Sequence, residues 1–143
     1  MIIVDTNVIS ESMRPQPHQN VIAWFNAQPW DSLYLCTPVL AELRYGAERL
    51  QRSRRKDFLS TAIDRIESEL FEGRILSFDQ AAAANYAHVA AGRERQGRRI
   101  QQMDALIAAI ALTHHARIAT RDITGFADWD LNWSIPLSLF EAA

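Results

Sequence analysis

The chain has 143 residues, of which 48% are hydrophobic and 22% are charged. This length and composition exclude a disordered chain and fit one domain with its own core, so we expect a single domain over residues 1–143. The formal net charge of −2 excludes a uniformly basic nucleic-acid binder and a strongly acidic mimic of nucleic acid. Lys56 is the only lysine, beside fourteen arginines.

Cysteine content and hydropathy indicate the compartment. Cys36 is the only cysteine, so neither an internal disulfide nor a cysteine-based metal site is expected. Three apolar residues stand between Met1 and Asp5, fewer than the roughly 7–15 of a signal peptide's apolar stretch. No window has the roughly 18 apolar residues of a membrane span. We therefore expect a cytoplasmic protein without membrane association.

Short apolar runs alternate with helical patterns along the chain. Because helices separate the strands, we expect right-handed crossovers and a mostly parallel sheet, with ligands at the carboxyl ends of its strands. Thr37 and Asp79 are the expected caps of the helices that follow them. In chain order, the pattern predicts strand 2–4, helix 6–13, helix 20–27, strand 33–36, helix 37–51, helix 57–71, strand 74–78, helix 79–95, helix 100–115, strand 116–120 and a short edge strand at 133–135.

Two acidic residues follow strands at the expected ligand-binding edge. Asp5 comes directly after the first strand, and Asp122 follows the fourth in the sequence Thr120-Arg121-Asp122. Either aspartate alone could simply cap a helix, so the pair gains meaning only together with other acids.

Two further acids lie within helical patterns. Asp104 is the only polar residue in residues 103–112, and an unpaired carboxylate buried there needs a cation, a base or a metal. The alternative is a place near the start of its helix, where the dipole favours an acid. Glu42 repeats the pattern one turn into its helix, between Val39 and Gly46, with a surface glutamate as the alternative.

These four acids can converge on one crevice. Their mutual repulsion would raise their pKa values unless a cation intervened. Ligands that are all carboxylate oxygens suit Mg²⁺ or Mn²⁺, which activate water and stabilise charge on a phosphoryl oxygen. Without a nucleophilic Cys or Ser motif, the set indicates metal-assisted hydrolysis of a phosphodiester.

Arginines gather in two clusters, each at a break between helices. Such runs are either solvated faces or phosphate contacts, for which the planar guanidinium is suited. The first cluster comprises Arg49, Arg52, Arg54, Arg55 and Lys56, and the second comprises Arg93, Arg95, Arg98 and Arg99. Our candidates for substrate binding are Arg44, Arg98, Arg99 and Arg121.

Four segments, in this order and spacing, resemble the signature of PIN domains. They are MIIVDTN at 1–7, AEL at 41–43, DALIAA at 104–109 and ATRD at 119–122. Ser10-Glu11 with Arg14-Pro15, and the run 73–79, resemble VapC-type toxins and particularly their FitB-like branch. The resemblance spans essentially the whole chain.

This resemblance implies a three-layer α/β/α fold around a mostly parallel sheet of four to five strands. It implies a Mg²⁺- or Mn²⁺-dependent endoribonuclease that is the toxin of a type II toxin–antitoxin pair. The implied partners are RNA, a DNA-binding antitoxin whose C-terminal segment covers the site, and a second copy of the toxin. By position, the catalytic and metal-binding acids would be Asp5, Glu42, Asp104 and Asp122, supported by Thr6, Asn7 and Thr120.

Two other functions stay open at this point. A phosphatase or receiver of the aspartyl-phosphate type would use Asp5, but such proteins have a second Asp where Asn7 stands and a Lys near the phosphate. Lys56 lies in a basic run instead. A non-catalytic RNA-binding or protein-interaction module would use the acids only as helix caps, and metal titration distinguishes it from a nuclease.

Overall fold

The computed structural model describes residues 1–98 and 101–122, which contain a parallel sheet of four strands. The strand order is β3-β2-β1-β4, and every neighbouring pair is parallel. β1 is buried along its whole length because its residues are apolar and β-branched and lie between two other strands. The strands are β1 (Ile2–Val4), β2 (Leu33–Cys36), β3 (Ile75–Leu76) and β4 (Arg117–Ala119).

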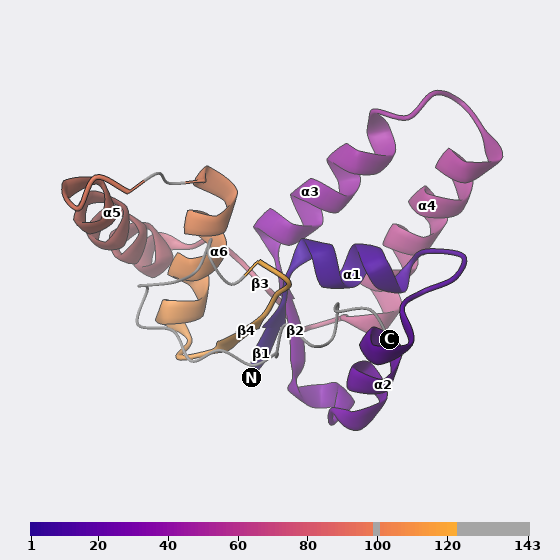
Figure 1. Ribbon diagram of the computed structural model, residues 1–143, viewed down its shortest axis with the longest axis horizontal. Helices are drawn as coiled ribbons and strands as arrows, with labels where there is room; N and C mark the ends of the chain where they lie inside the picture. Colours follow the sequence, from indigo (N-terminus) through magenta and orange to yellow (C-terminus); the bar gives the residue numbers. More distant parts are fainter. Residues whose placement is uncertain (99–100, 123–143) are drawn as a thin grey trace.

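Helices cover both faces of this sheet (Figure 1). α5 (Gln80–Arg95) and α6 (Gln102–Thr113) pack against each other on one side. The other side carries α1 (Thr6–Ser12), α2 (Gln19–Ala27), α3 (Thr37–Glu48) and α4 (Arg54–Arg65). The predicted three-layer α/β/α architecture is confirmed. Two short segments complete the described elements, the 3-10 turn η1 (Trp30–Ser32) and the π-helical η2 (Ile66–Leu70) that continues α4.

The core lies between β1 and the helices on its two sides. α6 is apolar almost all round, and its buried residues include Ala105, Ile107, Ala108 and Ile110. Such a helix is stable only when it is enclosed, here by the sheet and α5. Asp5 therefore follows directly after a buried strand in the middle of the sheet. No helix within the described residues combines the length and apolar character needed to cross a membrane.

Several predicted boundaries differ from the structure. The helix expected over 57–71 begins at Arg54 and ends in the π-helical η2, and strand 74–78 shortens to β3 because only two residues pair with β2. The cap predicted at Thr37 is wrong: Thr37 is the first residue of α3, and its hydroxyl accepts the Phe78 backbone N–H at 3.2 Å. Asp79 caps α5 as predicted, and strand 133–135 lies outside the described residues.

Candidate active site

The site begins where β1 and β4 end side by side. The two strands pair in register, with Val4 opposite Ala119. The Asp5 backbone N–H extends this pairing by donating to the Ala119 carbonyl at 2.9 Å. Asp5 and Thr120 are therefore neighbours at the carboxyl edge of the sheet, as the sequence predicts.

Asp5 is buried, with 5% of its surface exposed. Its carboxylate accepts hydrogen bonds from the Thr120 hydroxyl at 2.6 Å, the Asn7 side-chain amide at 3.2 Å and the Thr6 backbone N–H at 2.7 Å. The last bond also caps α1, so the helix cap predicted as the alternative for Asp5 is confirmed, and its role in the site stays a prediction. Burial raises the pKa of Asp5 above 3.8, and the nearby carboxylates add to the rise while the hydrogen bonds oppose it.

Glu42 enters the same site from α3. Because α3 begins directly after β2, the neighbour of β1, its first turns pass over the carboxyl end of β1. The Thr6 hydroxyl donates to Glu42 Oε1 at 2.8 Å, and the charge of Glu42 contributes to the raised pKa of Asp5. Glu42 is therefore a fixed group of the site and not a surface glutamate.

The segment after β4 is tied to the N-terminal segment by Asn7. The Asn7 side chain accepts the Arg121 backbone N–H at 3.0 Å through Oδ1 and reaches the Thr120 hydroxyl at 3.4 Å through Nδ2. The Asp122 backbone N–H donates to the same Thr120 hydroxyl at 3.0 Å. These bonds place Asp122 close enough to Asp5 for its charge to raise the pKa of Asp5.

Asp104 is the fourth carboxylate of the cluster. α6 begins at Gln102, two residues later than predicted, so Asp104 lies in the first turn, where the helix dipole favours an acid. Partial burial, followed by the charges of Asp5, Asp122 and Glu42, raises the pKa of Asp104 from 3.8 to about 6. Asp104 therefore lies near the start of its helix and near enough to the other acids for their charges to raise its pKa.

Arg93 is a further charged residue of this region that was not predicted. Its positive charge opposes the rise in the pKa of Asp104. The sequence groups Arg93 with the arginines at the end of α5, and only the packing of α5 against α6 brings its charge near the first turn of α6. No local pattern in the sequence contains this information.

The donor set fits a divalent cation. Its charged groups are carboxylates, and burial, together with their mutual repulsion, raises the pKa values of Asp5 and Asp104; a bound cation relieves that repulsion. Among the described residues, no three His, Cys, Asp or Glu side chains are already arranged as ligands around one point. Burial raises the pKa of the Cys36 thiol beside the site to about 12, so Cys36 is protonated at neutral pH and is not a nucleophile.

The predicted substrate-binding arginines are not all at the site. Arg44 donates to Asp64 at 2.7 Å and also pairs with Glu67, so its guanidinium joins α3 to α4 and η2. Arg121 lies at the site between Thr120 and Asp122 and is exposed. Arg98 is exposed after the end of α5, and Arg99 lies outside the described residues.

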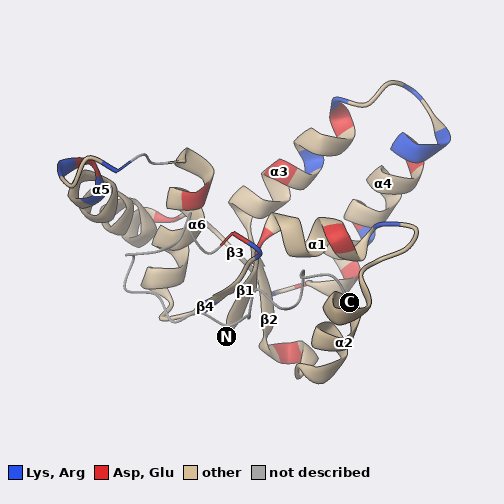
Figure 2. Ribbon diagram, viewed as in Figure 1, with Lys and Arg blue, Asp and Glu red and all other residues tan. Residues whose placement is uncertain are grey.

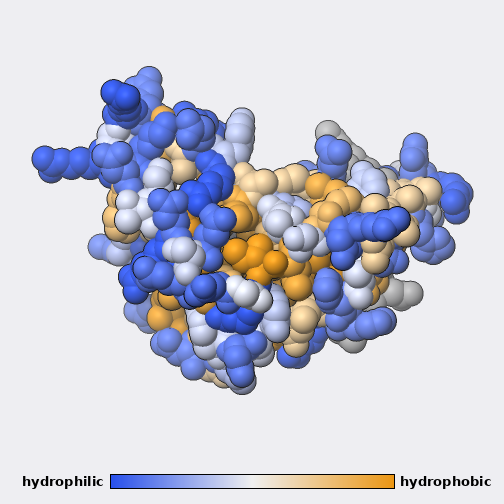
Figure 3. Space-filling view, turned by 180° about the vertical axis from the view of Figure 1, so that it is seen from behind, coloured by the Kyte–Doolittle hydropathy of each residue, from blue (hydrophilic) through white to orange (hydrophobic). Residues whose placement is uncertain are grey.

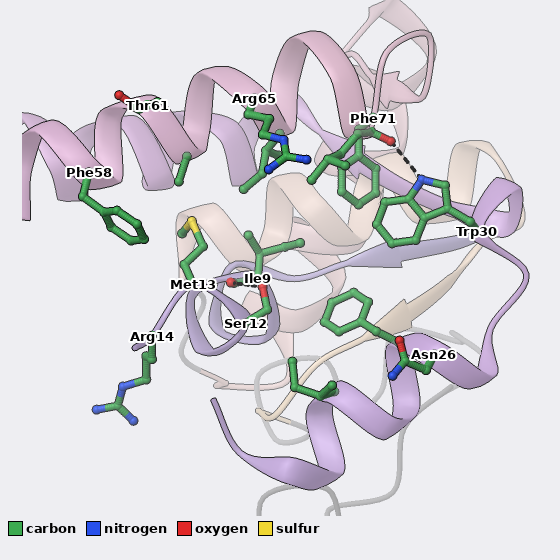
Figure 4. A pocket seen from close by; sticks show the side chains of 15 residues that line it. Ile9, Ser12, Met13, Arg14, Asn26, Trp30, Phe58, Thr61, Arg65 and Phe71 are labelled. Atoms are coloured by element: carbon green, nitrogen blue, oxygen red, sulfur yellow. Dashed lines mark hydrogen bonds between the residues drawn. The ribbon is translucent and has the colours of Figure 1, made fainter. Parts of the chain in front are cut away.

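An apolar groove of about 510 Å³ lies away from the carboxylates, between α1, α2 and α4 (Figure 4). No acidic residue lines it, so it has no part in metal chemistry. Three exposed apolar side chains, Ile22, Trp30 and Phe58, contribute to its wall, and Trp30 Nε1 donates to the Leu70 carbonyl at 3.1 Å. A hollow lined by exposed apolar groups is typical of a surface that binds another molecule.

Comparisons with known proteins agree with the fold and the motifs. Residues 2–130 match the family model of the PIN domain. Toxin FitB of Neisseria gonorrhoeae is 40% identical over 126 residues, which are 88% of this chain and 91% of that protein. VapC ribonuclease Y4jK of Sinorhizobium fredii is 36% identical over 126 residues, 88% of this chain and 90% of that protein. The crystal structure of FitAcB from Neisseria gonorrhoeae is similar with a TM-score of 0.88 and 39% identity, covering 96% of this chain and 99% of that chain.

The chain therefore belongs to the PIN-domain family, and the resemblance stated from the four sequence segments is confirmed.

Proposed function

We propose that this protein is a divalent-metal-dependent endoribonuclease and the toxin of a toxin–antitoxin pair. The observation that carries the proposal is the set of hydrogen bonds that holds the Asp5 and Glu42 carboxylates at the carboxyl edge of the sheet. Asp104 and Asp122 support it, because they lie near enough for the charges of the four acids to add to the raised pKa values of Asp5 and Asp104. Similarity to a FitB toxin and to a VapC ribonuclease supports the biological role.

The four carboxylates would hold Mg²⁺ or Mn²⁺, which lowers the pKa of a bound water and stabilises negative charge on phosphoryl oxygens. Thr120 and Asn7 fix the Asp5 carboxylate through hydrogen bonds, so its oxygens are oriented before any cation arrives. Thr6 fixes Glu42 in the same way, which suits Glu42 to orient the attacking water. Preorganisation of this kind lowers the cost of reaching the transition state.

The two alternative functions fit the site less well. An aspartyl-phosphate enzyme needs a lysine near the phosphate, yet Lys56 donates to the carbonyls of Glu48 and Leu50 in the loop after α3. A module that uses its acids only as helix caps accounts for Asp5, but Glu42 lies inside α3 and caps nothing. The carboxylate cluster therefore favours the nuclease.

The apolar groove supports the proposal that this protein binds an antitoxin. We propose that the antitoxin, a protein partner, covers the exposed apolar residues that line the groove between α1, α2 and α4. α1 joins the two surfaces, because its first residues belong to the acidic site and Ile9 and Met13 line the groove. The homodimer, the cytoplasmic location and the single domain over 1–143 remain predictions.

Replacement of the central carboxylate tests the nuclease. In Asp5→Asn the charge is lost but the shape is kept, so we expect Mg²⁺-dependent cleavage of a defined panel of RNAs to fall by about 100-fold or more. Asp31→Asn, which changes an exposed residue of η1 at the other end of β2, is the matched control and should cleave like the wild type. Equal cleavage by the Asp5 variant and the wild type, or cleavage unaffected by EDTA, would contradict the proposal.

A further inference from the structure

We infer that the tip of the hairpin formed by α3 and α4, defined as residues 48–57, is a docking surface for the RNA backbone, separate from the acidic site. Within these ten residues, five bases stand against two acids, Glu48 and Asp57, in a chain whose formal net charge is −2. The inference rests on the proposed ribonuclease function for its choice of RNA as the ligand.

The guanidinium groups of the tip are available to a ligand. Arg49, Arg52, Arg54 and Arg55 are exposed, and no carboxylate in the described part of the chain forms an ion pair with any of them. In contrast, the arginines farther along the hairpin, Arg44 and Arg65, pair with acids. Unpaired arginines concentrated at one end of an element are suited to phosphate contacts.

The tip is a fixed platform rather than a loose loop. Lys56 Nζ donates to the carbonyls of Glu48 at 2.9 Å and Leu50 at 3.1 Å, which closes the end of α3. Ser53 caps α4 by accepting the Lys56 backbone N–H at 3.1 Å. The one lysine of the chain therefore has a structural role, and the arginines around it are held on an ordered turn.

Two of these arginines stand where a positive charge opposes folding. Arg54 and Arg55 open α4, and the positive end of the helix dipole repels cations there. Ser53 already supplies the cap, so stability of α4 gives no reason for arginine at either position. Contact with an anion accounts for both charges.

The position of the tip matches the path of a polymer that passes through the acidic site. Figure 2 shows acidic residues along α3, one of them beside the tip, and the basic residues of the tip beyond the far end of the helix. Glu42 and Arg49 are separated by about 10 Å along the helix, at 1.5 Å per residue, which corresponds to about three nucleotides of a helical strand. Seen from behind, the tip is hydrophilic, whereas apolar side chains gather in the middle of that face (Figure 3).

RNA binding by an Asp5→Asn background, measured without Mg²⁺, tests the inference independently of cleavage. Arg54→Gln/Arg55→Gln removes two charges from the tip and relieves the repulsion with the helix dipole, so the variant should fold at least as stably as its parent. We expect its affinity for a fluorescent single-stranded RNA of about 20 nucleotides to fall about 5- to 20-fold at low salt, and the salt dependence to decrease by about 1.4 in slope. An RNA of about 2 nucleotides is shorter than the separation of about three nucleotides and cannot span both surfaces, so loss of the tip charges should lower its affinity less than that of the longer RNA.

Arg14→Gln/Arg117→Gln is the matched control, because it removes the same charge from two exposed positions outside the tip. It should change the affinity for the longer RNA by less than about twofold. Equal losses in the two double variants, or no loss in the tip variant, would overturn the inference. If the wild type cleaves RNA but the tip variant binds RNA normally, only the inference about the tip is refuted. If RNA binding depends on the tip but no metal-dependent cleavage is found, only the proposed ribonuclease function is refuted.

Discussion

The hydroxyl of Thr120 connects three groups of the acidic site. It donates to Asp5 and accepts the Asp122 backbone N–H, and the Asn7 amide lies within 3.4 Å of it. Because this one buried oxygen orients Asp5 and Asn7 near the N-terminus and Asp122 after β4, its removal should disturb all three groups at once.

Thr120→Val keeps the shape of the side chain and removes this oxygen. We expect RNA cleavage to fall about 10-fold and the free energy of unfolding to fall by about 1–2 kcal/mol, because the buried Asp5 carboxylate loses a hydrogen bond. The pKa of Asp5 should rise further, since the Thr120 hydrogen bond is the largest effect that lowers it. Thr120→Ser restores the hydroxyl and should restore most of the activity; a serine variant as impaired as the valine variant would show that the methyl group matters instead.

Asp104 predicts how stability depends on pH in the metal-free protein. The pKa of Asp104 is about 6 in the folded state, against an ordinary value of 3.8. The folded state therefore binds the proton more tightly, and the ionisation of Asp104 lowers the free energy of unfolding as the pH rises from about 4 to about 6. Above about pH 6 the full loss in the free energy of unfolding is present, and below about pH 4 there is none.

Asp104→Asn removes this cost. In EDTA at pH 7, we expect the variant to be more stable than the wild type by about 1 kcal/mol, because solvent screens a carboxylate that is only half buried. The gain should disappear at about pH 4, where the wild-type carboxyl is protonated. Urea unfolding measures the free energy of unfolding of the variant and the wild type at the two pH values, with the exposed Asp57→Asn as a control. An equal gain in stability at both pH values would contradict the electrostatic explanation.

The positions of the site residues could be predicted more readily than their contacts. Asp5 and Asp122 follow strands, so a parallel sheet alone brings them to one edge. The bond between Thr6 and Glu42 joins residues 36 positions apart and depends on the path of α3 after β2. The effect of Arg93 on Asp104 depends likewise on the packing of α5 against α6, which periodicity does not specify.

At the scale of elements, Arg74 holds the edge of the sheet together. β3 has only two residues, and the Arg74 guanidinium just before it donates to the carbonyls of Trp30, Leu33 and Leu70. It also lies over the rings of Trp30 and Phe71, at 5.6 and 5.3 Å from their centres. One side chain thus joins η1, β2 and η2.

Arg74→Lys keeps the charge but cannot reach several carbonyls from one planar group. We expect the free energy of unfolding to fall by about 1–2 kcal/mol, measured by urea denaturation, because two partly buried carbonyls and one exposed carbonyl lose a charged donor. Arg117→Lys, at an exposed position of β4, is the control and should be neutral. Equal stability of the two variants would show that the contacts of Arg74 contribute little.

The start of α4 shows why the boundaries of elements were harder to predict than their existence. The apolar pattern predicts a start at residue 57, whereas α4 begins at Arg54, although three basic residues in its first positions disfavour a helix start. The hydroxyl of Ser53 outweighs that repulsion by capping the helix. At the other end, the apolar spacing continues through η2, where the backbone changes to a π-helix without breaking the amphipathic pattern.

For the whole molecule, the carboxylate cluster predicts linkage between cation binding and folding. The proposed site would bind Mg²⁺ in the folded state and not in the unfolded chain, so Mg²⁺ at about 100 times its dissociation constant should stabilise the protein by about 2.7 kcal/mol. The melting temperature should rise by several degrees in the wild type and remain unchanged in Asp5→Asn/Asp104→Asn. NaCl at equal ionic strength is the control, and an equal rise in both proteins would show that Mg²⁺ acts outside the cluster.

The pairing of β4 with β1 has a consequence for synthesis of the protein. β1 is paired on one side by β2, which follows it closely in the sequence, but its other side stays open until residues 117–119 are made. Asp122 and the Thr120 hydroxyl, which orients Asp5, arrive with that same late strand. The proposed active site is therefore incomplete until residues 117–122 have been synthesised, long after β1 and α3.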